Sequence, residues 1–198
     1  MIRILLFILV SSTICFSQKT LFLGNNTAIC KDFIDKKVDT VQLHPLEDYD
    51  LIYIFSGARS VLTTNFLQEL DTFLTRGKGI YIGSENWPMQ SEARILTQHL
   101  FQKEFWENQS NLSSSGEVSD HKVIASENID PGRSVATFPM DVRLKVEVWL
   151  GDEPLILSSE YLGGRIILDG GYSRFYCPLN NDENKVLWDE ITAFLLGN

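Results

Sequence analysis

The sequence predicts an α/β fold in which helices cover both faces of a mostly parallel sheet, with antiparallel strands added late in the chain. Three observations lead to this prediction. Strand-like and helix-like patterns alternate from residue 20 to residue 105, which is typical of parallel sheets with crossover helices. Residues 49–55 (YDLIYIF) form an almost continuous apolar run, as expected for a central strand buried on both faces. Residues 154–161 and 165–169 are strand-like runs joined by a glycine-containing turn, which favours antiparallel pairing.

The elements of the first half follow from the spacing of apolar residues. Strands are expected over residues 20–24, 40–43, 49–55 and 79–82, and helices over 28–36, 64–76 and 91–105. The helix over 64–76 has the clearest amphipathic pattern, carried by Phe66, Leu67, Leu70, Phe73 and Leu74. Gly77 suits the left-handed position just past its end.

The second half begins with a polar segment, residues 108–120, which is expected to be an exposed loop. Residues 144–150 then alternate apolar and polar side chains, as a strand with one solvated face does. The strands over 154–161 and 165–169 follow, and a closing helix is expected over residues 183–196. These late strands supply the antiparallel part of the predicted sheet.

At 198 residues the chain has room for one domain, expected over residues 18–198. Residues 1–17 resemble a signal peptide, with Arg3, a short apolar run, and Cys15 and Ser17 at the −3 and −1 positions of a cleavage site. A hydrophobic N-terminal strand or a signal anchor is the alternative. The run is short for a membrane helix, so no stable membrane span is expected after cleavage. We therefore expect an exported bacterial protein, periplasmic or secreted, and the residues around Ser17 resemble signal peptides of Bacteroidota.

Net charge and cysteine content limit which binding partners, cross-links and metal sites are expected. The formal net charge of −9 disfavours nucleic acid, because an acidic surface repels phosphate groups. Cys30 and Cys177 remain after the expected cleavage, and an oxidising compartment would permit a disulfide between them. Independent burial of each thiol is the alternative. No clustered His/Cys pattern points to a metal site, and no cofactor is expected.

Four turns are expected to lie along one edge of the sheet, where open α/β sheets bind ligands. They are Gly24–Asn26, Ser56–Arg59, Gly83–Trp87 and Asp169–Arg174, and each contains glycine, which lets a backbone approach a ligand closely. Ordinary turn geometry would also explain these glycines. The candidate ligand-binding residues are Gly57, Arg59, Gly83, Ser84, Glu85, Asn86, Trp87, Asp169, Tyr172 and Arg174.

The segment FLQELDTFLTRGKGIYIGSENW resembles the region that leads to the nucleophile turn of class I glutamine amidotransferase-like domains. The segments YDLIYIFSG and GGRIILDGGYSRFY, with the terminal helix, are similar to exported or uncharacterised members of that superfamily. The resemblance implies a flavodoxin-like three-layer sandwich. Active members carry a cysteine at the turn and a downstream histidine and glutamate. This chain has Gly83-Ser84-Glu85-Asn86 at the turn and Asp169-Gly170-Gly171 in place of the histidine region, so the resemblance does not imply amidotransferase activity.

Other residues of the turns could also support catalysis. A serine nucleophile needs a nearby base, and Ser84, His121 and Asp169 could form such a set only if the polar loop folds back over the turn. Glu85 and Asp169 could act as paired carboxylates in glycoside chemistry. In a chain with 26 acidic residues such a pair also arises by chance. The catalytic candidates are thus Ser84, Glu85, His121 and Asp169.

The sequence therefore favours a non-catalytic domain over an enzyme. It is expected to bind an unknown small molecule or an envelope protein through the cleft at the carboxyl ends of its central strands. One alternative is a secreted or periplasmic hydrolase that uses Ser84 or Glu85 with His121 or Asp169. A second is a structural subunit of a cell-envelope assembly.

Overall fold

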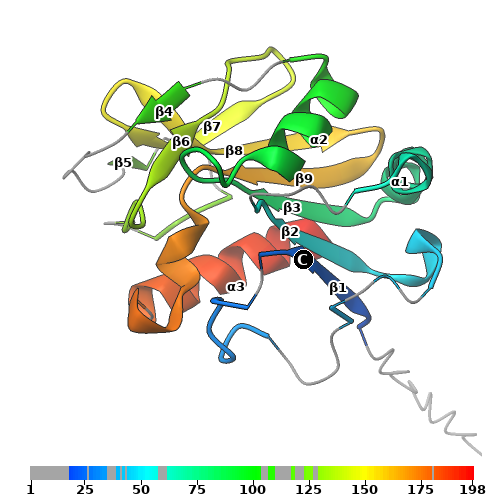
Figure 1. Ribbon diagram of the computed structural model, residues 1–198, viewed down its shortest axis with the longest axis horizontal. Helices are drawn as coiled ribbons and strands as arrows, with labels where there is room; N and C mark the ends of the chain where they lie inside the picture. Colours follow the sequence, from blue (N-terminus) through cyan, green and yellow to red (C-terminus); the bar gives the residue numbers. More distant parts are fainter. Residues whose placement is uncertain are drawn as a thin grey trace, which may run out of the picture.

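The computed structural model describes residues 18–25, 27–34, 39–40, 42, 44–57, 62–103, 107–109, 117–118, 123–126, 129–179 and 181–198 (Figure 1). Its centre is one twisted sheet. Strands β1 (Thr20–Gly24), β2 (Leu51–Phe55), β3 (Gly79–Gly83) and β9 (Gly164–Asp169) pair in parallel, in that order. Beyond β9 the sheet continues antiparallel through β8 (Glu153–Tyr161), β7 (Lys145–Leu150) and β5 (Glu117–Val118). The predicted α/β class, with a parallel part and late antiparallel strands, is confirmed.

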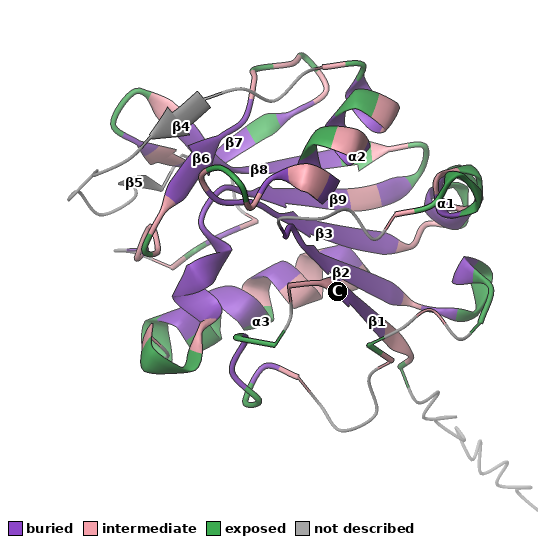
Figure 2. Ribbon diagram, in the orientation of Figure 1, coloured by how far each residue is buried: buried purple, intermediate pink, exposed green. Residues whose placement is uncertain are grey.

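Helices cover the parallel strands on both faces (Figure 1). Helices α1 (Thr64–Thr75) and α2 (Ser91–Phe101) lie on one face, and α3 (Asp182–Leu196) lies on the other. Because side chains alternate along a strand, Ile80 and Ile82 pack with α1 and α2 while Tyr81 packs with α3. The central strands β2 and β3 are buried along their whole length, as their purple colour in Figure 2 shows. The predicted three-layer sandwich is thereby confirmed.

Side-chain caps and left-handed residues set the helix ends. The Thr63 hydroxyl accepts a hydrogen bond from the Phe66 N–H at the start of α1, and Gly77 follows its end with a φ of 77°. The Asn181 amide oxygen likewise accepts from the Asn184 N–H at the start of α3. Helix α2 ends at Phe101, four residues before the predicted end, where Gln102 adopts a left-handed conformation.

The helix predicted over residues 28–36 is wrong for the part of it that the structure describes. Residues 27–34 form turns, and Ile29 makes an isolated antiparallel bridge to Tyr176. The Cys30 N–H donates to the Phe175 carbonyl oxygen at 2.9 Å, so the backbone of this segment bonds to a neighbouring segment rather than within a helix. In the predicted strand over 40–43, the described Thr40 is a bend, and the preceding Asp39 bridges Leu21.

The remaining elements are short. The 3₁₀ turns are η1 (Leu46–Asp48), η2 (Tyr172–Phe175) and η3 (Cys177–Leu179). Strands β4 (Glu107–Gln109) and β6 (Val135–Thr137) form a small antiparallel pair. The sequence predicts a loop over residues 108–120. In the structure, strand β4 lies at the start of this segment and strand β5 lies within it. Within the described residues, none of the helices has the length and apolar character needed to cross a membrane.

Candidate functional site

The carboxyl ends of the parallel strands meet at one edge of the sheet. The register pairs Gly24 with Phe55, Phe55 with Gly83, and Gly83 with Asp169. The turns that follow these strands are therefore neighbours. Arg59, a predicted ligand-binding residue in the turn after β2, lies outside the described residues.

Asp169 and Arg174 form an ion pair in the protein interior, and both side chains are completely buried. Arg174 Nη2 donates to Asp169 Oδ1 at 3.0 Å, and the same carboxylate accepts from the Tyr81 hydroxyl and the Gly171 N–H at 2.7 and 2.9 Å. Arg174 also donates to the carbonyl oxygens of Gly171 and Pro131. Its Nη1 has no hydrogen-bond partner among the described residues. These two predicted ligand-binding residues hold the loops together from within, where an external ligand does not reach them.

Glu85 is also an interior group, with 4% of its surface exposed. Its Oε1 accepts a hydrogen bond from the Ser173 N–H at 2.7 Å, and its Oε2 accepts from the Ser134 hydroxyl at 3.0 Å. Burial raises the pKa of the Glu85 carboxyl above its ordinary value, and the hydrogen bonds from Ser173 and Ser134 oppose that rise. The carboxylate thus connects the turn after β3 to two other segments of the strand-end edge.

Ser84 does not present its hydroxyl to solvent. The residue is completely buried, and its N–H donates to the Asp169 carbonyl oxygen at 2.7 Å. Its hydroxyl lies 3.4 Å from the carbonyl oxygens of Glu85 and Met89, to which it donates. A serine that donates to backbone carbonyls in the interior is a turn-stabilising residue, because a nucleophile needs access and a base that accepts its proton.

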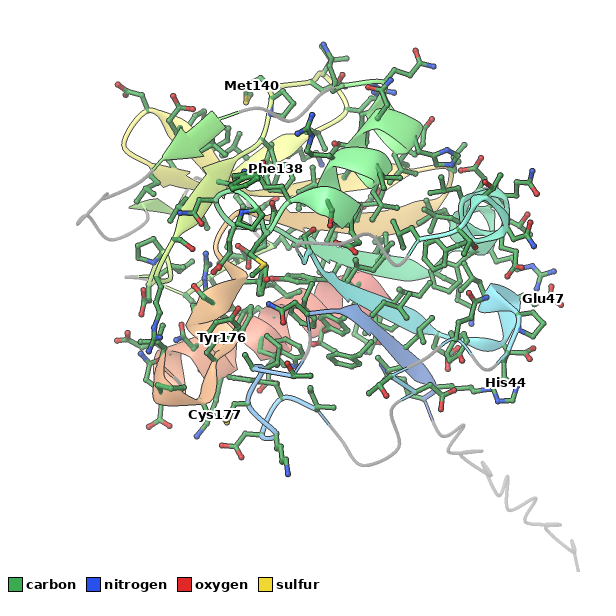
Figure 3. The ribbon with its side chains drawn as sticks, in the orientation of Figure 1. His44, Glu47, Phe138, Met140, Tyr176 and Cys177 are labelled. Carbon is green, nitrogen blue, oxygen red and sulfur yellow. The ribbon has the colours of Figure 1, made fainter. Side chains whose placement is uncertain are left out.

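The described histidines, His44 and His99, contact residues other than Ser84. His99 bonds to Asp71 on the exposed surface of the helical face, at 3.0 Å. His44 packs its ring against Tyr49 and lies across the molecule from Tyr176 (Figure 3). His121, the predicted partner of Ser84, lies outside the described residues.

Tyr172 and Gly57 join the ends of β1 and β2 to the rest of the edge. The Tyr172 hydroxyl donates to the Ser56 carbonyl oxygen at 2.6 Å and accepts from the Asn25 amide at 3.3 Å. The Gly57 N–H donates to the Glu92 carboxylate at 2.8 Å. Burial raises the pKa of the Tyr172 hydroxyl, so it stays protonated and able to donate.

Sequence reasoning missed several members of this network: Tyr81, Glu92, Ser134 and Ser173. Glu92 had a usable signal, since an acidic residue in the first turn of a helix is well placed to bind free backbone N–H groups. Ser134 had none, because its segment shows no periodic pattern.

A small set of side chains remains accessible at this edge, and we name it the strand-end rim: Asn25, Asn86, Trp87, Met89 and Tyr176. Trp87 is 70% exposed, while the other four are half-buried. The Asn25 amide contacts both Met89 Sδ and the Tyr172 hydroxyl, and the Tyr172 and Tyr176 rings pack edge to face with centroids 6.0 Å apart. Of the predicted ligand-binding residues that the structure describes in full, Asn86 and Trp87 are thus the ones that solvent reaches.

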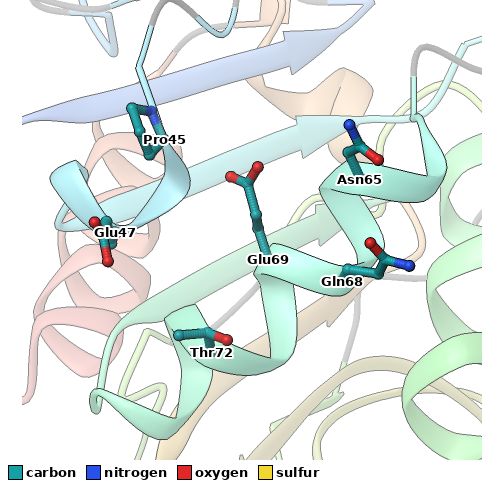
Figure 4. Close-up of a pocket in the computed structure, with 6 residues that line it drawn as sticks. All are labelled: Pro45, Glu47, Asn65, Gln68, Glu69 and Thr72. Carbon is teal, nitrogen blue, oxygen red and sulfur yellow. The ribbon is translucent and has the colours of Figure 1, made fainter.

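The depressions elsewhere on the described surface include two of similar volume. One, of about 520 Å³, runs between η1 and α1 (Figure 4); it is lined by Pro45, Glu47, Asn65, Gln68, Glu69 and Thr72. Its Glu69 carboxylate accepts from the Leu46 N–H and so helps to hold η1 on α1. The other, of about 510 Å³, lies beside the β7–β8 hairpin; its apolar lining includes Phe138, Pro139, Met140, Trp149 and Pro154. No predicted site residue lines either depression.

Over the described residues, no cluster of three or more His, Cys, Asp or Glu side chains has the arrangement needed to hold a metal ion. Cys30 is buried, Cys177 is exposed, and both are thiols. A disulfide between them therefore stays a prediction.

The buried carboxyl of Glu85 predicts a pH effect that Glu85→Gln should remove. The pKa of Glu85 is higher in the folded protein than its ordinary value of 4.5, so ionisation of this carboxyl destabilises the fold. The free energy of unfolding therefore falls as pH rises from about 4.5 through the pKa of Glu85 in the folded protein. Glutamine keeps the Ser173 contact and can donate to the Ser134 hydroxyl. We expect the variant to gain stability relative to wild type across that range and to keep a constant difference at lower pH. Urea unfolding from pH 3 to 8 measures this, and parallel pH profiles for the two proteins would contradict it.

Comparisons with known proteins show the fold. No protein-family model and no curated protein matches the chain. The cytoplasmic protein STM1381 of Salmonella typhimurium matches with a TM-score of 0.65 at 11% identity, over 90% of this chain and 99% of that one. The mmIFT52 N-terminal domain matches at 0.63 and 12%, over 89% and 97%. A ThuA-like protein from Bacteroides uniformis matches at 0.59 and 13%, over 90% and 91%. The structural neighbours thus include ThuA-like proteins, which have a class I glutamine amidotransferase-like fold.

The predicted export is contradicted by these comparisons. STM1381 and a second Salmonella typhimurium structure with this fold, STM3548, are named cytoplasmic proteins, which points away from a periplasmic or secreted location. The inference rested on one short apolar run after Arg3, a pattern that hydrophobic N-termini of other kinds share. Residues 1–17, predicted as the signal peptide, lie outside the described residues.

Proposed function

We propose that this chain is a non-catalytic member of the class I glutamine amidotransferase-like superfamily that binds a ligand or partner through the strand-end rim. One observation carries the proposal: Trp87 is 70% exposed and follows Glu85 by two residues, and the Glu85 carboxylate belongs to a buried network of hydrogen-bonded polar groups. A large aromatic ring held on a rigid support is the kind of residue that anchors a bound sugar or peptide.

The chemistry of the rim supports binding rather than reaction. Trp87 and Tyr176 supply aromatic faces, Met89 supplies a polarizable thioether, and Asn25 and Asn86 supply amide groups. The carboxylates of Glu85 and Asp169 lie beneath this surface, and each already accepts hydrogen bonds from the protein. A hydrolase would need at least one of these groups, or Ser84, to reach a substrate.

The β7–β8 depression supports a second candidate function, that of a structural subunit in a protein assembly. Met140 is 54% exposed beside it, and Val142 in the same segment is fully exposed. Exposed apolar side chains around a hollow are typical of a contact surface for another protein.

Thermal-shift measurements on the full chain would test the rim. The probes are maltotriose and cellotriose as neutral sugars, trialanine and trilysine as peptides, and phosphate and sulfate as anions. We expect at least one probe to raise the Tm of the wild type and to lose that effect in Trp87→Ala, because binding to the native state alone stabilises it.

Matched variants separate the two surfaces. Val186→Ala removes a similarly exposed apolar side chain from α3 and should keep any probe's effect, whereas Met140→Ala alters the β7–β8 depression. If a probe still raises the Tm of Trp87→Ala but not that of Met140→Ala, it binds at the β7–β8 depression rather than at the strand-end rim. If none of the probes shifts the wild type, the small-molecule form of the proposal fails.

A further inference from the structure

Two segments far apart in the sequence lie side by side next to the strand-end rim. Residues 27–34 run against the segment that contains η2 and η3. Ile29 pairs with Tyr176 in an antiparallel bridge, and the Cys30 N–H donates to the Phe175 carbonyl oxygen at 2.9 Å. Each segment carries one cysteine, Cys30 in the first and Cys177 in the second. The bridge therefore holds together the two backbone segments that carry the thiols.

The two thiols are close enough to interact: a side-chain hydrogen bond with Cys30 is the main cause that raises the pKa of the Cys177 thiol. Cys30 is 8% exposed, while Cys177 lies on the surface. Each cysteine directly follows a residue of the Ile29–Tyr176 bridge, so the two cysteines lie on neighbouring stretches of backbone. A disulfide requires the two cysteine Cα atoms to come within about 7 Å, and the bridge already holds the two segments side by side.

We propose that Cys30 and Cys177 are a reversible disulfide site, oxidised by low-molecular-weight disulfides through thiol–disulfide exchange. The exposed Cys177 loses its proton to solvent and attacks one sulfur of the small disulfide, which forms a mixed disulfide and releases one small thiol. The Cys30 thiolate then attacks the Cys177 sulfur, forms the Cys30–Cys177 bond and releases the second small thiol. Two protein thiols are oxidised, and one small disulfide is reduced to two thiols.

The division of exposure between the two residues fits these roles. Cys177 is open to the reagent, and Cys30 beneath it is positioned to resolve the mixed disulfide. The hydrogen bond to Cys30 is the main cause that raises the pKa of the Cys177 thiol. Exchange should therefore be slow at neutral pH and should accelerate as pH is raised toward 9, because the thiolate is the attacking species.

Oxidation would fasten residues 27–34 to the turns that carry Tyr172, Ser173 and Arg174. Those residues bind Asn25, Glu85 and Asp169, so the cross-link would tighten the support of the strand-end rim. It would also close a long loop of chain, which stabilises a protein mainly by restricting its unfolded state. The site is independent of the proposed binding function.

The test uses the full chain in a Cys15→Ser background, so that the third cysteine cannot compete. After incubation with oxidised glutathione we expect loss of both thiols to Ellman's reagent, a linked peptide containing Cys30 and Cys177, and a Tm higher by roughly 5–15 °C. Dithiothreitol should reverse all three changes.

Two comparison variants, Cys30→Ser and Cys177→Ser in the same background, should show neither the linked peptide nor the Tm rise. Persistent glutathione adducts on Cys177, with Cys30 still reactive after unfolding, would overturn the proposal. So would a linked peptide that appears only under denaturing conditions. Thiol counting on the otherwise unaltered chain gives the answer even if one serine variant fails to fold.

Discussion

Replacing Arg174 by methionine should lower the free energy of unfolding by about 3–5 kcal/mol, because it leaves the buried Asp169 carboxylate without its cation. Methionine fills much of the same volume, so the loss reports the charge rather than a cavity. The hydrogen bonds from Tyr81 and Gly171 remain, but they do not neutralise the carboxylate. Urea unfolding followed by tryptophan fluorescence measures the change, with the m-value as a check that the unfolding transition is otherwise the same.

A surface ion pair provides the matched control for Arg174. Lys185 pairs with Asp182 at 3.6 Å, and the Asp182 side chain is fully exposed. Lys185→Met should change stability by at most about 1 kcal/mol. The double variant Asp169→Asn, Arg174→Met should recover part of the loss, because no unpaired charge is left in the interior. An Arg174 variant as mild as the surface control would show that the strand-end network does not depend on this pair.

Replacing Gly170 by alanine should cost about 3 kcal/mol or more, because the added Cβ would lie 1.8 Å from the Ala136 carbonyl oxygen. The obstacle is backbone, which cannot rotate away as a side chain does. Hydrogen bonds hold both sides of the contact: Gly170 N–H donates to the Leu155 carbonyl oxygen at 2.9 Å, and Ala136 N–H donates to the Gly170 carbonyl oxygen at 2.8 Å. The methyl group must therefore displace β6 from the Gly170 backbone.

Gly151 is the matched glycine for this comparison. A Cβ there has no atom within 4 Å, and the cost of Gly151→Ala comes only from its φ of 62°, about 1–2 kcal/mol. Urea unfolding compares the two variants, and hydrogen exchange at the Ala136 amide should speed up in Gly170→Ala alone. Equal losses for the two glycines would mean that β6 adjusts without cost.

The sequence predicts a cleft at the carboxyl ends of the central strands, but this edge of the sheet is packed in the structure. Residues 129–137 are the reason. This segment covers the turns after β3 and β9: the Ser134 hydroxyl binds Glu85, the Pro131 carbonyl oxygen binds Arg174, and the Ala136 N–H binds Gly170. No periodic pattern marks it, so the sequence predicts no element there. The placement of Glu85 and Asp169 at the strand ends follows from local pattern, whereas their burial depends on what packs over them.

The same distinction explains the wrong helix over residues 28–36. Ile29, Phe33 and Ile34 have helical spacing, yet the described part folds as turns because its backbone bonds to the η2–η3 segment. Apolar residues in a short irregular segment can satisfy the core without a helix: Phe33 packs its ring against Phe175 and Trp188.

By itself the sequence determined the parallel strands β1, β2 and β3, the helices α1 and α3, and the strand-end position of the turns, because these depend on periodicity along short stretches of chain. It predicted β9 as part of the antiparallel addition, whereas β9 pairs in parallel with β3 and antiparallel with β8. Only the tertiary structure decided which turn residues face solvent. The acidic and basic groups at the strand ends pair inside the protein, where each charge gains a partner, and Trp87 is left outside. Burial depends on contacts between segments far apart in the chain, and local sequence does not encode those contacts one by one.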